Sequence, residues 1–290
     1  MQLNQKLAEG KFVILAEMEP PKGADPSIMV RQSRRVKELV DGFLVPEMNK
    51  AVMRMSSLGG AVVLQQNGMQ ALMQVCCRDR NRLALQADLL AASACGVQAV
   101  MAVRGEDVRF GDHPDAKAVY DLDELTLLDA IQKMQQGKDL AGVDLATAPR
   151  FLVGASVNAA AKGEPLEREL EAMAEKQKKG VSFWVTPPIF DLDAFGPFLN
   201  RIDRSKTPIL PTVLLLKSAG MARYMARNLE NISIPDSLVF RIQSAPDRVQ
   251  ECVRIAAETI SAVKAKGFAG VLISTIGWED RLPDILEQVR

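Results

Sequence analysis

Histidine and cysteine are scarce in this chain of 290 residues. His113 is the only histidine, so a histidine-rich metal site, or a Ser-His-Asp triad with several histidines, is not expected. The four cysteines (Cys76, Cys77, Cys95 and Cys252) have neither Cys-x-x-Cys spacing nor the density of a disulfide framework. The adjacent Cys76 and Cys77 could be redox-active or bind a metal with partners elsewhere. Alternatively, one packs inward and the other outward on a strand. We expect no metal site.

The sequence also lacks an excess of charge and a long apolar run. Lys+Arg and Asp+Glu number 36 each, so no basic surface predicts binding to nucleic acid or to an anionic membrane. No apolar run approaches the roughly 20 residues of a membrane span. Residues 1–10 do not contain the apolar core of a signal peptide. We therefore expect a cytoplasmic protein that binds neither nucleic acid nor membrane.

Short apolar stretches alternate with longer amphipathic stretches almost throughout the chain. The apolar stretches predict strands at 12–17, 42–46, 71–76, 98–103, 150–155, 181–186, 208–214 and 269–274. The amphipathic stretches predict helices near 27–40, 52–66, 80–95, 122–136, 165–179, 192–203, 218–229, 246–266 and 279–289. Eight strand–helix units are typical of a (β/α)8 TIM barrel, whose usual size is about 250 residues.

No break in composition and no flexible linker divides the chain. We therefore expect a single TIM-barrel domain over residues 1–290. An open, doubly wound sheet is the alternative fold. The first predicted strand is not followed by Gly-x-Gly-x-x-Gly, which argues against a dinucleotide-binding sheet of that type.

Two carboxylates, Glu17 and Glu19, follow the first predicted strand and precede the Pro20-Pro21 pair. Side chains at the carboxyl ends of strands in such folds point into the ligand crevice. Apolar walls around an acid there would raise its pKa and make it a proton donor near neutral pH. The alternative is that both are solvated loop residues, one of them capping the next helix.

Other strand ends carry groups that suit a polar or phosphate-bearing ligand. Arg104-Gly105 could hold a phosphate, or Arg104 could form a salt bridge with Glu106 or Asp107. Tyr120 could stack on an aromatic ligand or simply pack at the top of the barrel. Lys217 precedes a helix after the seventh strand, a position that favours anions, but it could also be an ordinary loop residue.

Three arginines lie close together at the start of one predicted helix, in Cys77-Arg-Asp-Arg-Asn-Arg82. Arginines beside strand ends could form an anion site. A solvated basic first turn is the alternative, and it is favoured for Arg80 and Arg82 more than for Arg78.

Taken together, several motifs resemble those of the methylenetetrahydrofolate reductases. They are Glu17-Met-Glu-Pro-Pro21, Ala51-Val-Met-Arg-Met-Ser56, Cys77-Arg-Asp-Arg-Asn-Arg82, Arg104-Gly-Glu-Asp107 and Ile276-Gly-Trp-Glu279. The chain is most similar to the short form of acetogens and sulfate reducers, from about residue 10 to residue 285. The resemblance implies a TIM barrel that binds flavin at the carboxyl ends of its strands. It also implies hydride transfer from reduced nicotinamide, through the flavin, to 5,10-methylenetetrahydrofolate.

The resemblance implies roles for individual residues. Glu17 matches the general acid that protonates the folate. Positions that match cofactor contacts, or replace them, are Arg104, Gly105, Glu106, Tyr120, Ser156, Glu169 and Lys176. Substrate-side positions are Glu19, Pro187 and Lys217. The cofactor would be FAD or FMN, with electrons from reduced nicotinamide or from a zinc- or iron–sulfur-containing partner subunit in an oligomer.

Several positions depart from the family pattern at the ligand face. Pro46 replaces a threonine and Pro187 a glutamine, so each has lost a hydrogen-bonding side chain. Ser156 replaces a tyrosine, and Glu106 replaces a shorter aspartate. Three lost hydrogen bonds at ~0.5–1.5 kcal/mol each could weaken ligand binding by orders of magnitude. The alternative to an active reductase is therefore a non-catalytic or flavin-free folate-binding subunit of a multi-protein complex.

Overall fold

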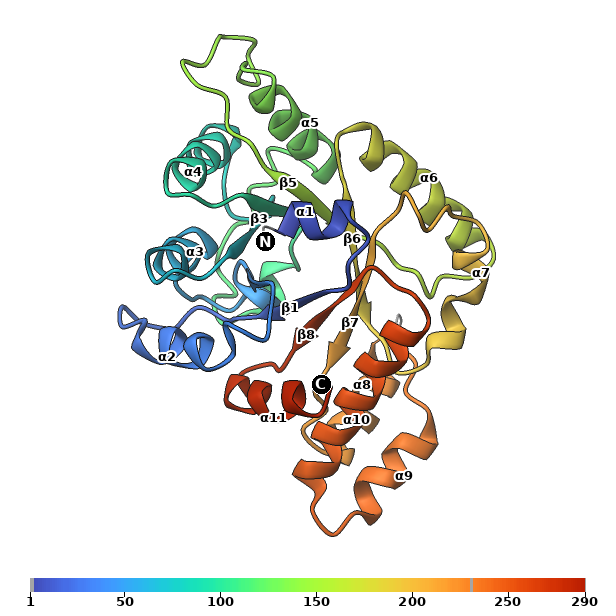
Figure 1. Ribbon diagram of the computed structural model, residues 1–290. Helices are drawn as coiled ribbons and strands as arrows, with labels where there is room; N and C mark the ends of the chain where they lie inside the picture. The colour runs from blue at the N-terminus through green and yellow to red at the C-terminus, as the bar shows by residue number, and fades with distance from the viewer. Residues whose placement is uncertain (1–2, 230–231, 290) are drawn as a thin grey trace.

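The computed structural model describes residues 3–229 and 232–289, and a closed barrel of parallel strands forms its centre (Figure 1). Within these residues, eight strands follow one another around the ring: β1 (Val13–Glu17), β2 (Gly42–Val45), β3 (Ala71–Cys76), β4 (Ala99–Val103), β5 (Leu152–Ser156), β6 (Phe183–Pro188), β7 (Ile209–Leu214) and β8 (Gly270–Ser274). β8 pairs with β1, so the ring has no free edge. The predicted (β/α)8 barrel is confirmed. The open doubly wound sheet is excluded, because such a sheet has two edges.

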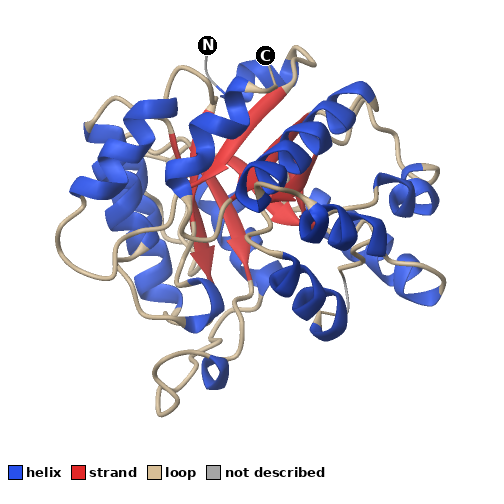
Figure 2. Ribbon diagram, turned by 90° about the horizontal axis from the view of Figure 1, so that it is seen from below, coloured by secondary structure: helices blue, strands red, loops and turns tan. Residues whose placement is uncertain are grey.

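Helices surround the strands (Figure 1 and Figure 2). Those near the predicted positions are α2 (Ser27–Val36), α3 (Ser57–Gln66), α4 (Arg82–Ala94), α5 (Glu124–Gln135), α6 (Glu164–Lys178), α7 (Gly196–Leu199), α8 (Ala219–Asn228), α10 (Arg248–Ala265) and α11 (Leu282–Glu287). Short 3-10 turns are η1 (Asn49–Ala51), η2 (Val108–Phe110), η3 (Leu192–Phe195) and η4 (Glu279–Arg281). None of the helices in residues 3–229 and 232–289 has both the length and the apolar character needed to cross a membrane.

Some of the predicted helix boundaries were wrong. α3 begins at Ser57 and not at residue 52, because the hydroxyl of Ser56 accepts a hydrogen bond from the Gly59 amide at 3.2 Å and caps the helix. The helix predicted at 192–203 is the short η3–α7 pair. α1 (Leu3–Ala8) and α9 (Asp236–Ser244) were not predicted.

Alternate residues of each strand point into the barrel. The inner apolar cluster contains Val13 and Leu15 of β1, next to Leu272 of β8. Phe183 of β6 fills the space beside Gly154 of β5, where a Cβ atom would lie 2.2 Å from the phenyl ring. The interior is therefore a packed core, so a ligand of the barrel would bind at the strand ends and not inside it.

The two ends of the barrel are covered differently. At the amino-terminal end, α1 lies across the ring (Figure 1), and Leu3 is buried in the inner cluster with Leu7 packed against it. At the carboxyl end, the next inward positions beyond Leu15 and Leu272 are the polar Glu17 and Ser274. The polar end is where the candidate site lies.

Candidate active site

Glu17 is the last residue of β1 and lies at the carboxyl-terminal mouth of the barrel. Because Ala16 pairs with Ile273, the following residues Glu17 and Ser274 lie side by side on neighbouring strands. The hydroxyl of Ser274 donates a hydrogen bond to Oε1 of Glu17 at 2.9 Å. On the other neighbour, β2, Pro46 follows the strand and is buried. The carboxyl thus has one hydroxyl partner and one apolar neighbour at the strand ends.

This environment makes Glu17 a weak acid. Burial raises the pKa of Glu17 to about 7, and the hydrogen bond from Ser274 opposes that rise. The negative charges of Glu19 and Glu279 raise the pKa of Glu17 further. A carboxyl with this pKa is about half protonated at neutral pH, so it can act as a proton donor.

Glu19 has a different partner and a different environment. Its carboxylate pairs with Arg54 at 3.0 Å, and both side chains are partly exposed. Burial raises the pKa of Glu19, while the charge of Arg54 lowers it. Glu19 therefore contributes to the electrostatics of the mouth through an ion pair, whereas Glu17 forms none with the residues that the structure describes.

Lys217 links the loops that follow β7 and β8. Its Nζ donates a hydrogen bond to the carbonyl oxygen of Ile276 and lies 5.2 Å from the ring centroid of Trp278. Glu279, 8% exposed, accepts a hydrogen bond from the Gly277 amide at 3.0 Å. Within the described residues, no carboxylate lies within salt-bridge distance of Lys217, although its charge lowers the pKa of Glu19. Lys217 can therefore also attract an anionic ligand.

The Arg104–Gly105 turn follows β4, three strands around the ring from β1. The guanidinium of Arg104 lies 5.6 Å from the ring centroid of Tyr120, and Tyr120 donates a hydrogen bond to the carbonyl oxygen of Gly105 at 3.3 Å. Gly105 has a φ of +86°, and a Cβ atom would lie 2.4 Å from Sγ of Cys76, so only glycine fits. The described residues offer Arg104 no carboxylate within salt-bridge distance, and Arg104 is exposed. The turn can therefore receive a phosphate-bearing ligand beside an aromatic ring.

The buried side chain of Arg78 holds the Arg104–Gly105 turn in place through hydrogen bonds. It is 1% exposed, and its guanidinium donates to both carboxylate oxygens of Asp79 and to the carbonyl oxygens of Glu106 and Met48. The carboxylate of Glu106 is 3.7 Å from Arg78. Arg78 thus joins the loops after β2, β3 and β4, and Glu106 is a partner of Arg78.

The other arginines of the same block also have acidic partners. Arg80 pairs with the buried Glu47 at 3.2 Å and with Asp88 at 3.0 Å. Arg82 pairs with Asp121 at 2.9 Å. Each guanidinium of this block is therefore already paired with a carboxylate, which argues against an anion site there.

The predicted cofactor positions after β5 lie together on one side of the mouth. Lys176 of α6 forms a 2.8 Å ion pair with Glu124 and lies 3.4 Å from the carbonyl oxygen of Ser156. Glu169, about two turns earlier on the same face of α6, accepts a hydrogen bond from the backbone amide of Asn158 at 2.8 Å. These side chains hold the β5 loop against α6 and α5.

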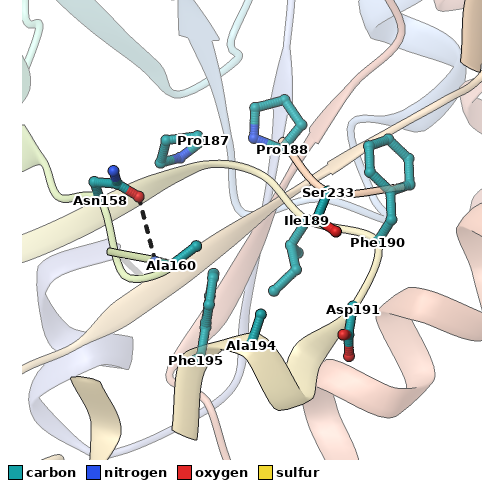
Figure 3. Close-up of a pocket in the computed structure, with 10 residues that line it drawn as sticks. All are labelled: Asn158, Ala160, Pro187, Pro188, Ile189, Phe190, Asp191, Ala194, Phe195 and Ser233. Carbon is teal, nitrogen blue, oxygen red and sulfur yellow. Dashed lines mark hydrogen bonds between the residues drawn. The ribbon is translucent and has the colours of Figure 1, made fainter. Parts of the chain in front are cut away.

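Pro187 lines a pocket beside the loops after β5 and β6 (Figure 3). Asn158 and Pro187 lie at one side of it, while Phe190 and Phe195 contribute aromatic walls. The strand register shifts between Val185 and Pro188. Proline cannot donate a backbone hydrogen bond, which is consistent with this irregularity.

The adjacent cysteines are both buried and both reduced. Burial raises the pKa of Cys76 to about 11 and that of Cys77 to about 12, so neither is a thiolate at neutral pH. Cys76 contacts the Arg104–Gly105 turn, and Cys77 packs in the outer apolar cluster. This supports the packing alternative. Nowhere in residues 3–229 and 232–289 do three His, Cys, Asp or Glu side chains gather as metal ligands would.

Two groups that affect Glu17, Glu279 and Asn49, were not predicted from the sequence. Glu279 was noted only as part of a motif, although its position five residues beyond the last strand placed it at the mouth. Asn49 lies in the loop after β2, and its side chain opposes the rise in the pKa of Glu17. Its position shortly after a strand was its only signal in the sequence.

Comparisons with known proteins point to one family. The profile of the family described as "Methylenetetrahydrofolate reductase" matches residues 2–290. "Methylenetetrahydrofolate reductase 2" of Schizosaccharomyces pombe is 26% identical over 190 residues, which is 63% of this chain and 29% of the yeast protein. The chain therefore matches less than a third of the length of that curated relative.

Solved structures share the barrel at low identity. An uncharacterized protein from Clostridium thermocellum, described as binding two copies of 5-methyl-5,6,7,8-tetrahydrofolic acid, has a TM-score of 0.59 at 17% identity and covers 99% of this chain and 97% of its own. The EDTA monooxygenase of Chelativorans sp. BNC1 has a TM-score of 0.60 at 9% identity, with coverages of 96% and 92%. These two likenesses show the fold. Because the family profile spans nearly the whole sequence, the chain belongs to the methylenetetrahydrofolate reductase family.

Proposed function

We propose that this protein reduces 5,10-methylenetetrahydrofolate to 5-methyltetrahydrofolate with a bound flavin. The observation that carries the proposal is the Glu17 carboxyl at the barrel mouth, whose pKa burial raises to about 7. By resemblance, Glu17 matches the family's general acid. The Clostridium thermocellum protein, described as binding 5-methyltetrahydrofolic acid on the same fold, supports a folate as the substrate.

Glu17 would deliver the proton that opens the folate's five-membered ring. Its O–H donates to a ring nitrogen, whose bond to the one-carbon unit then breaks, and Glu17 remains as a carboxylate. Because the acid must start protonated, the reactive fraction falls as the pH rises through about 7. Solvent protonates Glu17 again before the next turnover.

The Arg104–Gly105 turn fits a flavin nucleotide, either FAD or FMN. The exposed guanidinium of Arg104 is the group that would hold a phosphate, and the Tyr120 ring lies beside it. Ser156, Glu169 and Lys176 would border the cofactor on the β5 side. A bound flavin would supply hydride to the one-carbon unit.

Lys217 and Glu19 would bind the folate on the opposite side of the mouth, and Pro187 would contact it from β6. Electrons would come from reduced nicotinamide or from a zinc- or iron–sulfur-containing partner subunit. By the same family resemblance, we propose a cytoplasmic oligomer.

The test is turnover of methylenetetrahydrofolate by the protein loaded with FAD or FMN, compared with Glu17→Gln. The substitution removes the proton donor and keeps the shape, so we expect kcat to fall about 10²–10⁴-fold while the flavin spectrum is unchanged. Full activity of Glu17→Gln would contradict the role of Glu17. A colourless protein that rejects both flavins would contradict the cofactor.

A second candidate function is a non-catalytic or flavin-free folate-binding subunit. It is favoured by Pro46 and Pro187, which place pyrrolidine rings where hydrogen-bonding side chains would orient a ligand. Calorimetry distinguishes the two functions, because folate binding without flavin binding is expected only for the second.

A further inference from the structure

A groove of about 750 Å³ runs between α2 and α3, two neighbouring helices on the outside of the barrel (Figure 1). Three of its four half-buried lining residues are apolar, namely Pro26, Val30 and Val63. The exposed part of its lining is polar and includes three arginines of α2. The groove therefore has an apolar base and a positively charged rim, and it lies apart from the residues of the candidate active site.

The arginines of the rim are Arg31, Arg34 and Arg35. Arg31 is three and four residues from the other two, so the three like charges lie on adjacent turns of one helix face. Within the described residues, no carboxylate lies within salt-bridge distance of any of them, and the sequences of α2 and α3 contain no Asp or Glu. The whole chain has equal numbers of acidic and basic residues, so this is a local excess of positive charge.

The contacts that these arginines do make are with uncharged groups. Arg34 donates a hydrogen bond to Oδ1 of Asn67 at 2.7 Å, and Arg35 donates to the carbonyl oxygen of Asp280 at 3.4 Å. Arg31 has no hydrogen-bond partner among the described residues. The helix dipole favours cations in the last turn, which accounts for Arg34 and Arg35 but not for Arg31 in the middle of α2.

Other helices of the outer wall neutralise their exposed arginines. Arg168 of α6 pairs with Glu164, and Arg254 of α10 pairs with Glu251, in each case within one helix. The rim of the α2–α3 groove has no such acids, although like charges at this spacing destabilise a helix. Its positive charge is therefore free to attract carboxylates from another molecule.

We propose that the α2–α3 groove binds an acidic segment of a partner protein. Carboxylates of that segment pair with the three arginines, and an apolar side chain packs against Val30 and Val63. Charge complementarity supports this occupant, and so does the composition of the lining, which contains arginine and no lysine. Arginine is enriched and lysine depleted in protein interfaces. A small anion would use the guanidinium groups but not the apolar base.

The first experiment is a fluorescence anisotropy titration of the full chain with a labelled peptide of Glu-Glu-Leu repeats. We expect binding that weakens as salt is added, because exposed ion pairs are screened. A peptide of Lys-Lys-Leu repeats should not bind, and one of Glu-Glu-Ser repeats should bind more weakly because it lacks the apolar side chain. Combining Arg31→Glu, Arg34→Glu and Arg35→Glu should weaken binding by about 10-fold or more.

The matched control combines Arg150→Glu, Arg227→Glu and Arg248→Glu. These arginines are exposed and do not line the groove, so the net charge changes equally while the rim stays intact. Peptide binding should then change by less than about 2-fold. Arg31→Glu alone is the second test variant, because it removes no hydrogen bond within the described residues. Thermal melts confirm that the compared proteins are folded.

Photo-crosslinking in the cells that make the protein identifies the natural occupant. We introduce p-benzoylphenylalanine in place of Gln66, which lines the groove from α3. We expect an adduct with an acidic segment of another protein, and we expect the triple substitution of the rim to abolish it. The proposal does not depend on the reductase activity.

Several outcomes would overturn the proposal. They are equal peptide binding by the rim variant and the wild type, no adduct at residue 66, or an adduct with a neutral or basic segment. An adduct with a second copy of this chain would show self-association instead. Displacement of the peptide by inorganic tripolyphosphate at lower concentrations than by unlabelled peptide would show a site for a small anion.

Discussion

The two ends of the barrel are built from the same strands and differ in nearly every other respect. At the amino-terminal end, α1 buries Leu3 among inner residues such as Val13, and the contacts are apolar. At the carboxyl end, Glu17 has a pKa of about 7. The loops there contain all five non-glycine residues with positive φ in the described chain: Met48, Lys50, Ala51, Tyr120 and Ile276.

This difference indicates how stability and chemistry are divided in the molecule. Burial of Leu3 closes the core and requires no special geometry. The carboxyl-terminal mouth, by contrast, lowers the stability of the folded state. It keeps a carboxyl partly buried and a stretch of backbone strained, and both are unfavourable. Three changes would break or sharpen this comparison.

The largest effect is expected at the amino-terminal end of the barrel, which α1 covers. Leu3→Ala removes a fully buried side chain and leaves a cavity, so the free energy of unfolding should fall by ~2–5 kcal/mol. Urea denaturation measures this change. Leu83→Ala is the control, because Leu83 is 74% exposed and its loss should change stability by less than about 0.5 kcal/mol. The folded Leu3→Ala protein should keep its kcat. A large loss of kcat would contradict the view that this end of the barrel serves stability and the other end serves chemistry.

The next largest effect is the pH dependence of stability that Glu17 causes at the carboxyl-terminal mouth. The folded protein holds the Glu17 proton more tightly than the unfolded chain does, because burial raises its pKa from 4.5 to about 7. The stabilising contribution is therefore complete below pH 4.5 and is lost as the pH rises to 7, by up to about 3 kcal/mol. Glu17→Gln does not titrate. We expect its stability relative to the wild type to rise between pH 4.5 and 7, which parallel urea melts would show. A constant difference across this range would contradict the raised pKa.

The smallest effect is expected from relief of backbone strain. Ala51→Gly replaces a left-handed residue with one that adopts positive φ freely, so stability should rise by about 1 kcal/mol. Ala87→Gly, in the exposed middle of α4, should instead lower stability by about 1 kcal/mol. Thermal melts of the two variants give the comparison. Equal losses in both would show that the 48–51 segment is not strained.

Much of the barrel could be predicted from the sequence. Each predicted strand overlaps an observed one, because buried parallel strands are continuous runs of apolar residues such as 71–76 and 209–214. α1 and α9 were missed because they are short, six and nine residues, so their periodicity is weak. α1 covers the amino-terminal end of the barrel. That end forms only when the strands close into a ring, so no local sequence pattern indicates it.

The candidate site was predicted less completely. The position of Glu17 after a strand indicated the mouth, and burial raises its pKa as that position predicted. Its partner Ser274 lies 257 residues away in the chain, and Arg78 binds the carbonyl oxygens of Met48 and Glu106 from two other loops. The catalytic and ligand-binding roles of the named residues stay predictions.

By itself, the sequence determined the order of strands and helices and the placing of carboxylates and arginines at the strand ends, because these follow from local periodicity. Only the tertiary structure decided which of these groups meet. Pairing of β8 with β1 brings the Ser274 hydroxyl to Glu17. Arg78, from another loop, binds the carbonyl oxygen of Met48 and so helps to hold the 48–51 segment in a conformation that residues with a Cβ atom rarely adopt. The physical reason is that closing the barrel joins the two most distant strands of the chain, and the apolar burial that drives closure also holds a carboxyl and a strained loop in place.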